Sequence, residues 1–107
     1  MLKETQREWY RDRIREQYYK SLPDGQIKAF APPALRRMDE VIEALALGCT
    51  LARPRQFGAS YMEAKDFRRI ADKLDGNIMA VAVDALQKNE KRVKNRVWYI
   101  LGILARF

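Results

Sequence analysis

Apolar residues in the first part of the chain repeat at the spacing of one helix face. Neither proline nor glycine interrupts residues 3–20, and the apolar positions are one, four or five residues apart. Residues four apart lie above one another on a helix, so the pattern predicts a helix over residues 3–20 with an aromatic, buried stripe. The members of this stripe are Trp9, Tyr10, Ile14, Tyr18 and Tyr19.

The other faces of this predicted helix carry opposite charges three positions apart. Charged pairs at this spacing stabilise a helix by roughly 0.2–0.5 kcal/mol each. We expect them to pair with one another on the solvated side. The pairs are Glu4 with Arg7, Glu8 with Arg11 and Asp12 with Arg15.

Prolines and a glycine separate this helix from a second one. Residues 21–33 contain Pro23, Gly25 and the pair Pro32-Pro33, which favours a connection. In residues 34–47 the apolar positions step by three and four, and Gly48 follows where a helix C-cap commonly uses glycine. The sequence predicts a second helix that ends at Gly48.

The helical period is lost between residues 49 and 61. Pro54 and Gly58, with apolar pairs around them, predict an irregular excursion or a small hairpin. A third helix then begins at Ser60, because Ser60 and Glu63 form the capping-box pattern in which each side chain satisfies the other's backbone amide.

Two further helices complete the predicted fold. Residues 78–86 have a helical apolar pattern, and Asp75 or Asn77 would serve as N-cap. The last helix begins with Asn95 as N-cap and is apolar around most of its circumference, which is typical of a central helix or of one covered by further chain. We therefore predict an all-α fold. It is a small bundle of about five helices forming one domain over residues 1–107 of a longer protein.

Composition excludes several classes of chemistry. The chain has 107 residues, no histidine and one cysteine, which excludes an internal disulfide, the usual zinc ligand sets and a Ser-His or Cys-His nucleophile. Its longest apolar stretch is far shorter than the roughly 18 residues that span a bilayer, and no secretory signal opens it. We expect a cytoplasmic protein that is not an enzyme, needs no cofactor and does not contact a membrane.

Positive charge is concentrated in the second half of the chain. The formal net charge is +7, and the tightest cluster lies just ahead of and across the start of the last predicted helix. Backbone amides and the dipole at a helix start favour anions, so this cluster is a candidate phosphate site that would position DNA without reading its bases. The alternative is a well-solvated link between two helices. The cluster consists of Lys88, Lys91, Arg92, Lys94 and Arg96.

Smaller basic groups and the aromatic residues extend this hypothesis. A second candidate phosphate group is Arg68 with Arg69 and Lys73, and Arg53 with Arg55 forms a minor pair. Exposed aromatic side chains beside cations would stack single-stranded bases, but burial in the core is the competing interpretation. Of the aromatics at adjacent positions, Tyr10 or Tyr19 is expected to be exposed.

Carboxylates are the only residues left that suit catalysis. The candidates are Asp39, Glu40 and Glu43 on the second predicted helix, with Asp66 and Asp72 on the third. Asp39 and Glu43 are four apart on one helix face and would suit a divalent cation. A solvated helix face explains them more simply, because no other ligand converges on them. Cys49 is expected to be a small buried apolar residue.

The end of the chain resembles a known family. Val93-Lys94-Asn95, Tyr99 and the closing apolar residues up to Leu104 resemble the last helix of the helical domain that follows the DNA-binding part of plasmid replication initiator A proteins. Residues 37–43 are similar to that family's Asp-Glu-Ile-Val-Glu helix. Ala105 and Arg106 depart from its aromatic-Asn ending. A more distant resemblance, through Tyr99 and Ile103, is to the C-terminal domain of DnaD-like primosomal proteins.

Both resemblances imply DNA replication. The expected function is an accessory domain of a replication initiator that binds DNA backbone weakly and without sequence preference, docks other replication proteins, or does both. The alternative is a protein-interaction or homodimerisation module that does not bind nucleic acid and whose charge keeps it soluble.

Overall fold

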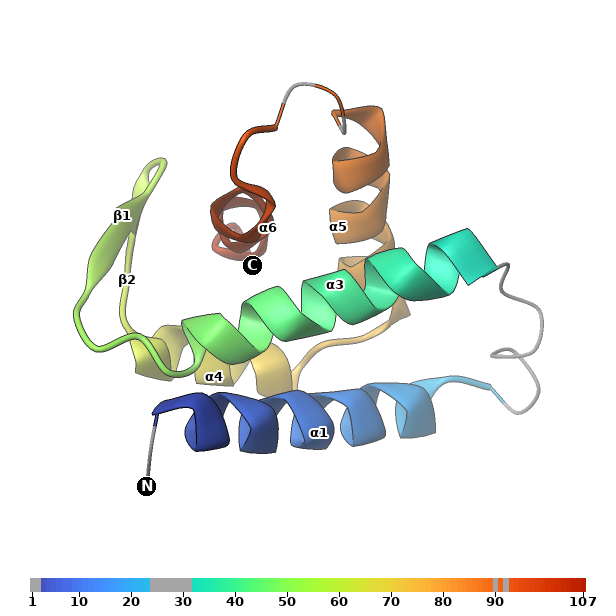
Figure 1. Cartoon of the computed structure of the whole chain (residues 1–107), viewed down its shortest axis with the longest axis horizontal. Helices are drawn as coiled ribbons and strands as arrows, with labels where there is room; N and C mark the ends of the chain where they lie inside the picture. The colour runs from blue at the N-terminus through green and yellow to red at the C-terminus, as the bar shows by residue number, and fades with distance from the viewer. Residues whose placement is uncertain (1–2, 24–31, 90, 92) are drawn as a thin grey trace.

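Helix α3 (Pro32–Gly48) is the element on which the other helices pack. The structure is a computed structural model that describes residues 3–23, 32–89, 91 and 93–107. Helix α1 (Lys3–Ser21) lies along one side of α3 and runs antiparallel to it, whereas α5 (Gly76–Lys88) and α6 (Arg96–Leu104) cover the other side (Figure 1). With α4 (Ala64–Asp72), the described residues form five helices, so the predicted all-α bundle is confirmed.

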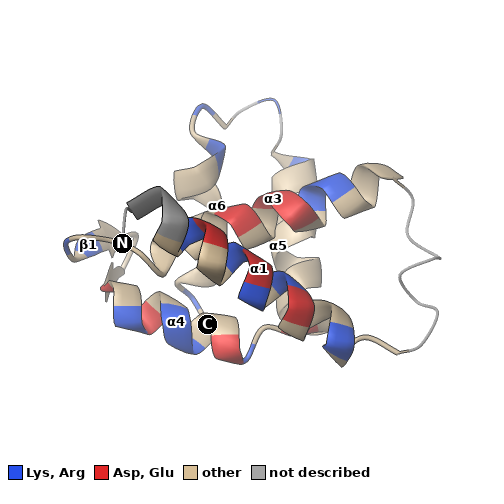
Figure 2. Ribbon diagram, turned by 60° about the horizontal axis from the view of Figure 1, so that its bottom comes forward, with Lys and Arg blue, Asp and Glu red and all other residues tan. Residues whose placement is uncertain are grey.

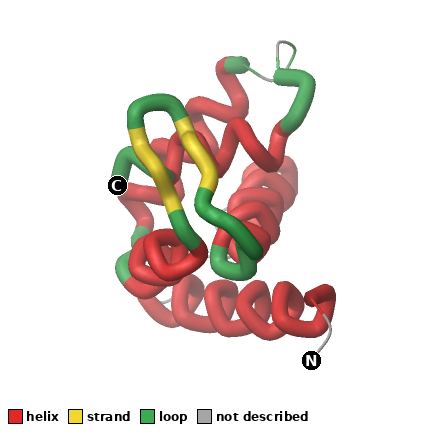
Figure 3. The backbone as a smooth tube through the Cα atoms, turned by 90° about the vertical axis from the view of Figure 1, so that its left-hand side faces the viewer, coloured by secondary structure: helices red, strands yellow, loops and turns green. Residues whose placement is uncertain are grey.

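The segment after α3 that lacks the helical period forms a β-hairpin. Strand β1 (Arg55–Phe57) pairs antiparallel with β2 (Ser60–Met62), with Phe57 opposite Ser60 (Figure 3). Gly58 has a φ of 59° at the first of the two loop positions, which is the pattern of a type II′ turn and one that strongly favours glycine. Phe57 and Met62 point inward and are buried, so the hairpin closes one end of the core.

The predicted start of the third helix at Ser60 is wrong. Ser60 lies in β2, and the N-cap of α4 is Glu63, whose backbone N–H donates to Asp66 Oδ2 at 2.8 Å. A capping box is a local pattern, but pairing with β1 and burial of Met62 hold residues 60–62 in an extended conformation. The helix therefore begins three residues later, where Glu63 and Asp66 repeat the same pattern.

Helix α3 ends at Gly48 as predicted, and this glycine is required there for close packing and not for a left-handed backbone. A Cβ atom at this position would lie 2.8 Å from Phe67 Cγ and 2.9 Å from Leu101 Cδ2. Among the described residues only Gly58 has a positive φ. Absence of a side chain at Gly48 thus lets the end of α3 approach α4 and α6.

Helix α6 is central to the bundle. Ile100, Leu101 and Leu104 are fully buried, and α6 packs against both α3 and α5. Side-chain caps fix the two helix starts as predicted: Asp75 accepts from the N–H of Ile78 at 2.9 Å, and Asn95 caps α6. Within the described ranges, no helix has the length and apolarity to cross a bilayer.

The predicted ion pairs within α1 are replaced by pairs between helices. Arg11 Nη1 lies 3.3 Å from Glu43 Oε1, and Arg15 Nε lies 3.4 Å from Asp39 Oδ1. Arg11 also contacts its neighbour Asp12, whereas the side chain of Glu4 lies outside the described residues. Figure 2 shows the acidic stretch of α3 beside the mixed charges of α1. These arginines therefore help to align α1 with α3.

Candidate nucleic-acid interface

The predicted phosphate cluster lies where the chain passes from α5 to α6. Lys88 ends α5, Arg96 begins α6, and Lys91 and Lys94 are exposed between them. Arg92 lies outside the described residues. No carboxylate in the described part of the chain forms an ion pair with Lys91 or Lys94. These two lysines remain available to an anion from outside.

Two other members of the cluster are held by carboxylates of the protein itself. Arg96 donates to both oxygens of Glu40 on α3, with 2.7 Å between Nη2 and Oε1, and both side chains are about two-thirds buried. Lys88 Nζ lies 3.0 Å from Asp84 Oδ2, one turn earlier in α5. Bidentate arginine–carboxylate pairs are directional and charge-assisted. Arg96 therefore fixes α6 against α3 instead of facing an outside phosphate.

One backbone N–H group and the dipole at the start of α6 already have partners within the protein. Asn95 accepts a hydrogen bond from the backbone N–H of Trp98 at 3.1 Å, which confirms it as N-cap. The carboxylate of Glu40 places a negative charge beside Arg96, the first residue of the helix. A phosphate near this end would thus be attracted mainly by the exposed lysines and less by the helix terminus.

The second predicted group does not join the first. Arg68 Nε donates to the backbone oxygen of Cys49 at 3.0 Å, and its guanidinium lies 5.4 Å from the centre of the Tyr10 ring. Arg69 is exposed and lies 3.6 Å from Asp66, and Lys73 donates to the backbone oxygen of Phe107. Figures 1 and 3 place α4 and the loop ahead of α6 at opposite ends of the molecule. The two groups cannot form one continuous patch.

Arg55 adds a cation to the start of α6 that its position in the sequence does not reveal. The Arg55 guanidinium lies 4.0 Å from the ring centre of Trp98, in the first turn of α6. Stacking uses the flat face of the guanidinium and leaves its in-plane N–H groups free to contact phosphate. We call Arg55, Lys91 and Lys94 the α6 basic face. The sequence alone does not group Arg55 with the lysines, because the grouping depends on how the hairpin pairs and on its packing against α6.

Most of the aromatic candidates are buried or partly buried, and the exposed aromatic side chains differ from the predicted ones. Tyr18 is buried, which raises its pKa, and Tyr10 and Tyr19 are partly buried. Among the described residues, the exposed aromatic side chains are Trp9, at 50% of its surface, Tyr61, at 66%, and Phe107, at 42%. The face of α1 that packs on its neighbours contains Tyr10, so its neighbour Trp9 points outward.

The carboxylates considered for metal binding serve packing between helices. Asp39, Glu40 and Glu43 form ion pairs with Arg15, Arg96 and Arg11, respectively. In the described ranges no three His, Cys, Asp or Glu residues come together as a metal site would require. These carboxylates therefore have a structural explanation.

Cys49 is fully buried at the end of α3. Burial raises the pKa of its thiol to about 12. The protonated thiol is a poor nucleophile, because the thiolate is the reactive form. Cys49 thus acts as the small apolar residue predicted from the sequence.

Comparisons with family models, curated proteins and solved structures give no match. The side chains described above therefore provide the basis for assigning a function.

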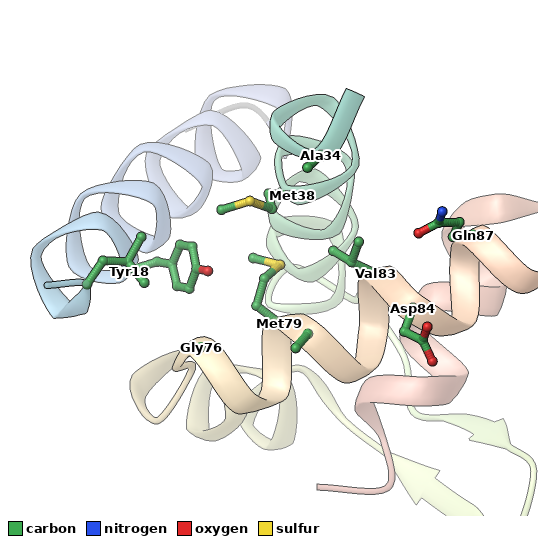
Figure 4. Close-up of a pocket in the computed structure, with 10 residues that line it drawn as sticks. Tyr18, Ala34, Met38, Gly76, Met79, Val83, Asp84 and Gln87 are labelled. Atoms are coloured by element: carbon green, nitrogen blue, oxygen red, sulfur yellow. The ribbon is translucent and has the colours of Figure 1, made fainter. Parts of the chain in front are cut away.

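An apolar groove opens between α1, α3 and α5 (Figure 4). Tyr18, Met38, Met79 and Val83 are among the residues that line it, and its volume is about 330 Å³. Methionine side chains adapt to differently shaped apolar partners. Asp84, on the α5 side, already pairs with Lys88. This groove suits an apolar side chain better than it suits a phosphate.

Proposed function

We propose that this chain is an accessory domain of a plasmid-type replication initiator that binds the phosphate backbone of DNA weakly and without sequence preference. The observation that supports this function is the α6 basic face, where Lys91 and Lys94 are exposed and have no ion-pair partner in the described part of the chain. Arg55 borders the same helix turn with its guanidinium stacked on Trp98. The resemblance of residues 93–104 to replication initiators points in the same direction.

The proposed contact positions DNA and does not read its sequence. The three cations of the α6 basic face come from a loop and from the short strand β1, so no helix carries a row of base-reading side chains into the major groove. Three neutralised phosphates would give a slope of log affinity against log salt of about −2.7 for duplex DNA and about −2.1 for single strands. Affinity for duplex would then fall roughly 40-fold for a fourfold rise in salt.

Fluorescence anisotropy of labelled duplex and single-stranded DNA, titrated at several salt concentrations, tests this function. The double variant Lys91→Gln, Lys94→Gln should weaken binding and make the duplex salt slope shallower by about 1.8. The matched control is Lys20→Gln with Lys65→Gln, because both lysines are exposed but pair with Glu16 and Glu63. Equal effects of the two double variants would show that only net charge matters and would refute a defined basic face.

A docking function is the second candidate, and the apolar groove of Figure 4 favours it. Val83 is partly buried at this groove, so Val83→Glu would place a charge where an apolar partner would bind. If the groove joins two copies of the chain, light scattering should show a mass that rises with concentration and a Val83→Glu variant that stays monomeric. A concentration-independent monomeric mass for the wild type would exclude the homodimer.

A further inference from the structure

A second groove, between α1 and α4, combines aromatic rings with arginines. Trp9 and Tyr10 pack edge to face, with ring centres 4.9 Å apart, and Trp9 keeps half of its surface exposed. The Arg13 guanidinium lies 5.2 Å from the Trp9 ring centre, and Arg68 lies over Tyr10 across the groove. Each ring thus has a cation beside it, and α1 lies on one side of α3 while the loop that leads into α6 lies on the other (Figure 1).

The groove is held in shape by contacts beneath it. Arg68 is tied to the backbone oxygen of Cys49 at 3.0 Å and to the ring of Tyr10, so its position is fixed before any ligand arrives. Ile14, which is 2% exposed, forms part of the floor. A preformed site loses little side-chain freedom on binding. The exposed half of Trp9 is therefore the part of this preformed surface that a ligand can reach.

The polar residues of this groove match the edge of a nucleobase. Gln17 and Asp72 line it beside the rings and the two arginines. A glutamine amide both donates and accepts hydrogen bonds, and a carboxylate accepts them from base N–H groups. The volume is about 190 Å³, below the range of pockets that enclose whole small molecules. A groove of this volume suits a single flat ring that belongs to a longer ligand chain.

We propose that the α1–α4 groove binds one base of single-stranded nucleic acid, stacked on Trp9, with the neighbouring phosphate on Arg13. This rests on the proposed function, because it adds a base-stacking site to a domain that holds the phosphate backbone elsewhere. Stacking requires an unpaired base, since bases in a duplex present only their edges. The groove therefore gives the domain a preference for single strands that the α6 basic face alone lacks.

The test measures anisotropy of labelled oligo(dT) and of a duplex of equal length with four proteins: wild type, Trp9→Leu, Trp9→Phe and Tyr61→Leu. Loss of one base–aromatic stack should weaken oligo(dT) binding of Trp9→Leu by roughly 5- to 150-fold. Trp9→Phe should restore most of the affinity, and duplex binding should not change. Stacking itself releases no counterions and Arg13 is unchanged in Trp9→Leu, so the salt slope of this variant should stay close to that of the wild type.

Tyr61→Leu is the matched control for removing an exposed aromatic residue. Tyr61 is opposite Gln56 in the hairpin, on the strand face opposite to that of Arg55, so its loss should leave both kinds of binding unchanged. Circular dichroism of each variant checks that the fold is retained.

The outcomes separate this inference from the proposed function. If Trp9→Leu binds oligo(dT) as tightly as the wild type, or if Tyr61→Leu loses as much affinity as Trp9→Leu, the groove does not bind a base. If only the double variant Lys91→Gln, Lys94→Gln loses affinity, the groove is overturned and the α6 basic face is supported. The reverse pattern keeps the groove and overturns the basic face. A wild-type protein that binds neither DNA overturns both.

Discussion

Replacing Gly48 by alanine tests how closely α3 approaches its neighbours. The added methyl group would lie 2.8 Å from Phe67 Cγ and 2.9 Å from Leu101 Cδ2. Both neighbours are 0% exposed, so neither can move into solvent to make room. We expect Gly48→Ala to destabilise the protein.

Two terms of opposite sign set the size of this effect. Alanine is favoured over glycine in a helix by about 0.5–1 kcal/mol, whereas an extra carbon in a close-packed core costs about 1–3 kcal/mol. Gly102→Ala in α6 is the matched control, because no neighbouring atom lies within 4 Å of its Cβ position. Gly102→Ala should stabilise by about 0.5–1 kcal/mol, and Gly48→Ala should be about 1–3 kcal/mol less stable than that control.

Urea denaturation followed by far-ultraviolet circular dichroism measures this difference. The slope of unfolding free energy against urea should be the same for both variants, since neither changes the area exposed on unfolding. In thermal unfolding, each kcal/mol corresponds to about 4–8 °C in a domain near this size. Equal stabilities of the two variants would refute the close approach of α3 to Phe67 and Leu101.

Three other predictions concern Asn95, the pair Arg96 and Lys94, and Cys49. Asn95→Ala should lower the free energy of unfolding by about 1 kcal/mol, because the Trp98 amide loses its acceptor, and Asn95→Ser should recover most of it; denaturation checks both. Arg96→Gln should lower stability and leave DNA affinity close to wild type, whereas Lys94→Gln should do the reverse, as anisotropy and denaturation together would show. Burial holds the pKa of Cys49 at about 12 against about 8.5 in the unfolded chain, so the unfolded state loses the proton first. Its contribution to stability is therefore constant below about pH 8.5 and falls by about 1.4 kcal/mol per pH unit above it, and Cys49→Ala should remove that component from a pH series of denaturation curves.

Local patterns in the sequence predict most of the helix positions. Periodic apolar residues located α1, α3 and α5, and the caps Asp75 and Asn95 are short-range features that the structure confirms. Ser60 shows where such reasoning fails. Its capping-box pattern is as good as that of Glu63 and Asp66, but long-range burial of Phe57 and Met62 decides in favour of the strand.

The candidate site could be predicted only in part, because proximity in sequence does not show which charges are paired. Arg96 looked equivalent to Lys94, yet its partner Glu40 is 56 residues away. Likewise, Trp9 and Tyr10 are adjacent and similar in character, and only the packing of α1 on α3 and α4 leaves Trp9 as the exposed one. Tyr61 carried no helical pattern, and its exposure follows from alternation along β2.

Packing between helices decides which positive charges this protein can offer to a partner. The acidic residues of α3 pair with arginines of α1 and α6 whose side chains are more than half buried. Because those pairs cancel, the cations that an outside anion can reach are exposed side chains without an ion pair in the described residues, among them Lys91, Lys94 and Arg13. Total charge would suggest a uniformly basic molecule. The lysines ahead of α6 are exposed and form no ion pair within the described residues, so charge changes there should affect binding more than changes at lysines that pair with carboxylates, such as Lys20 and Lys65.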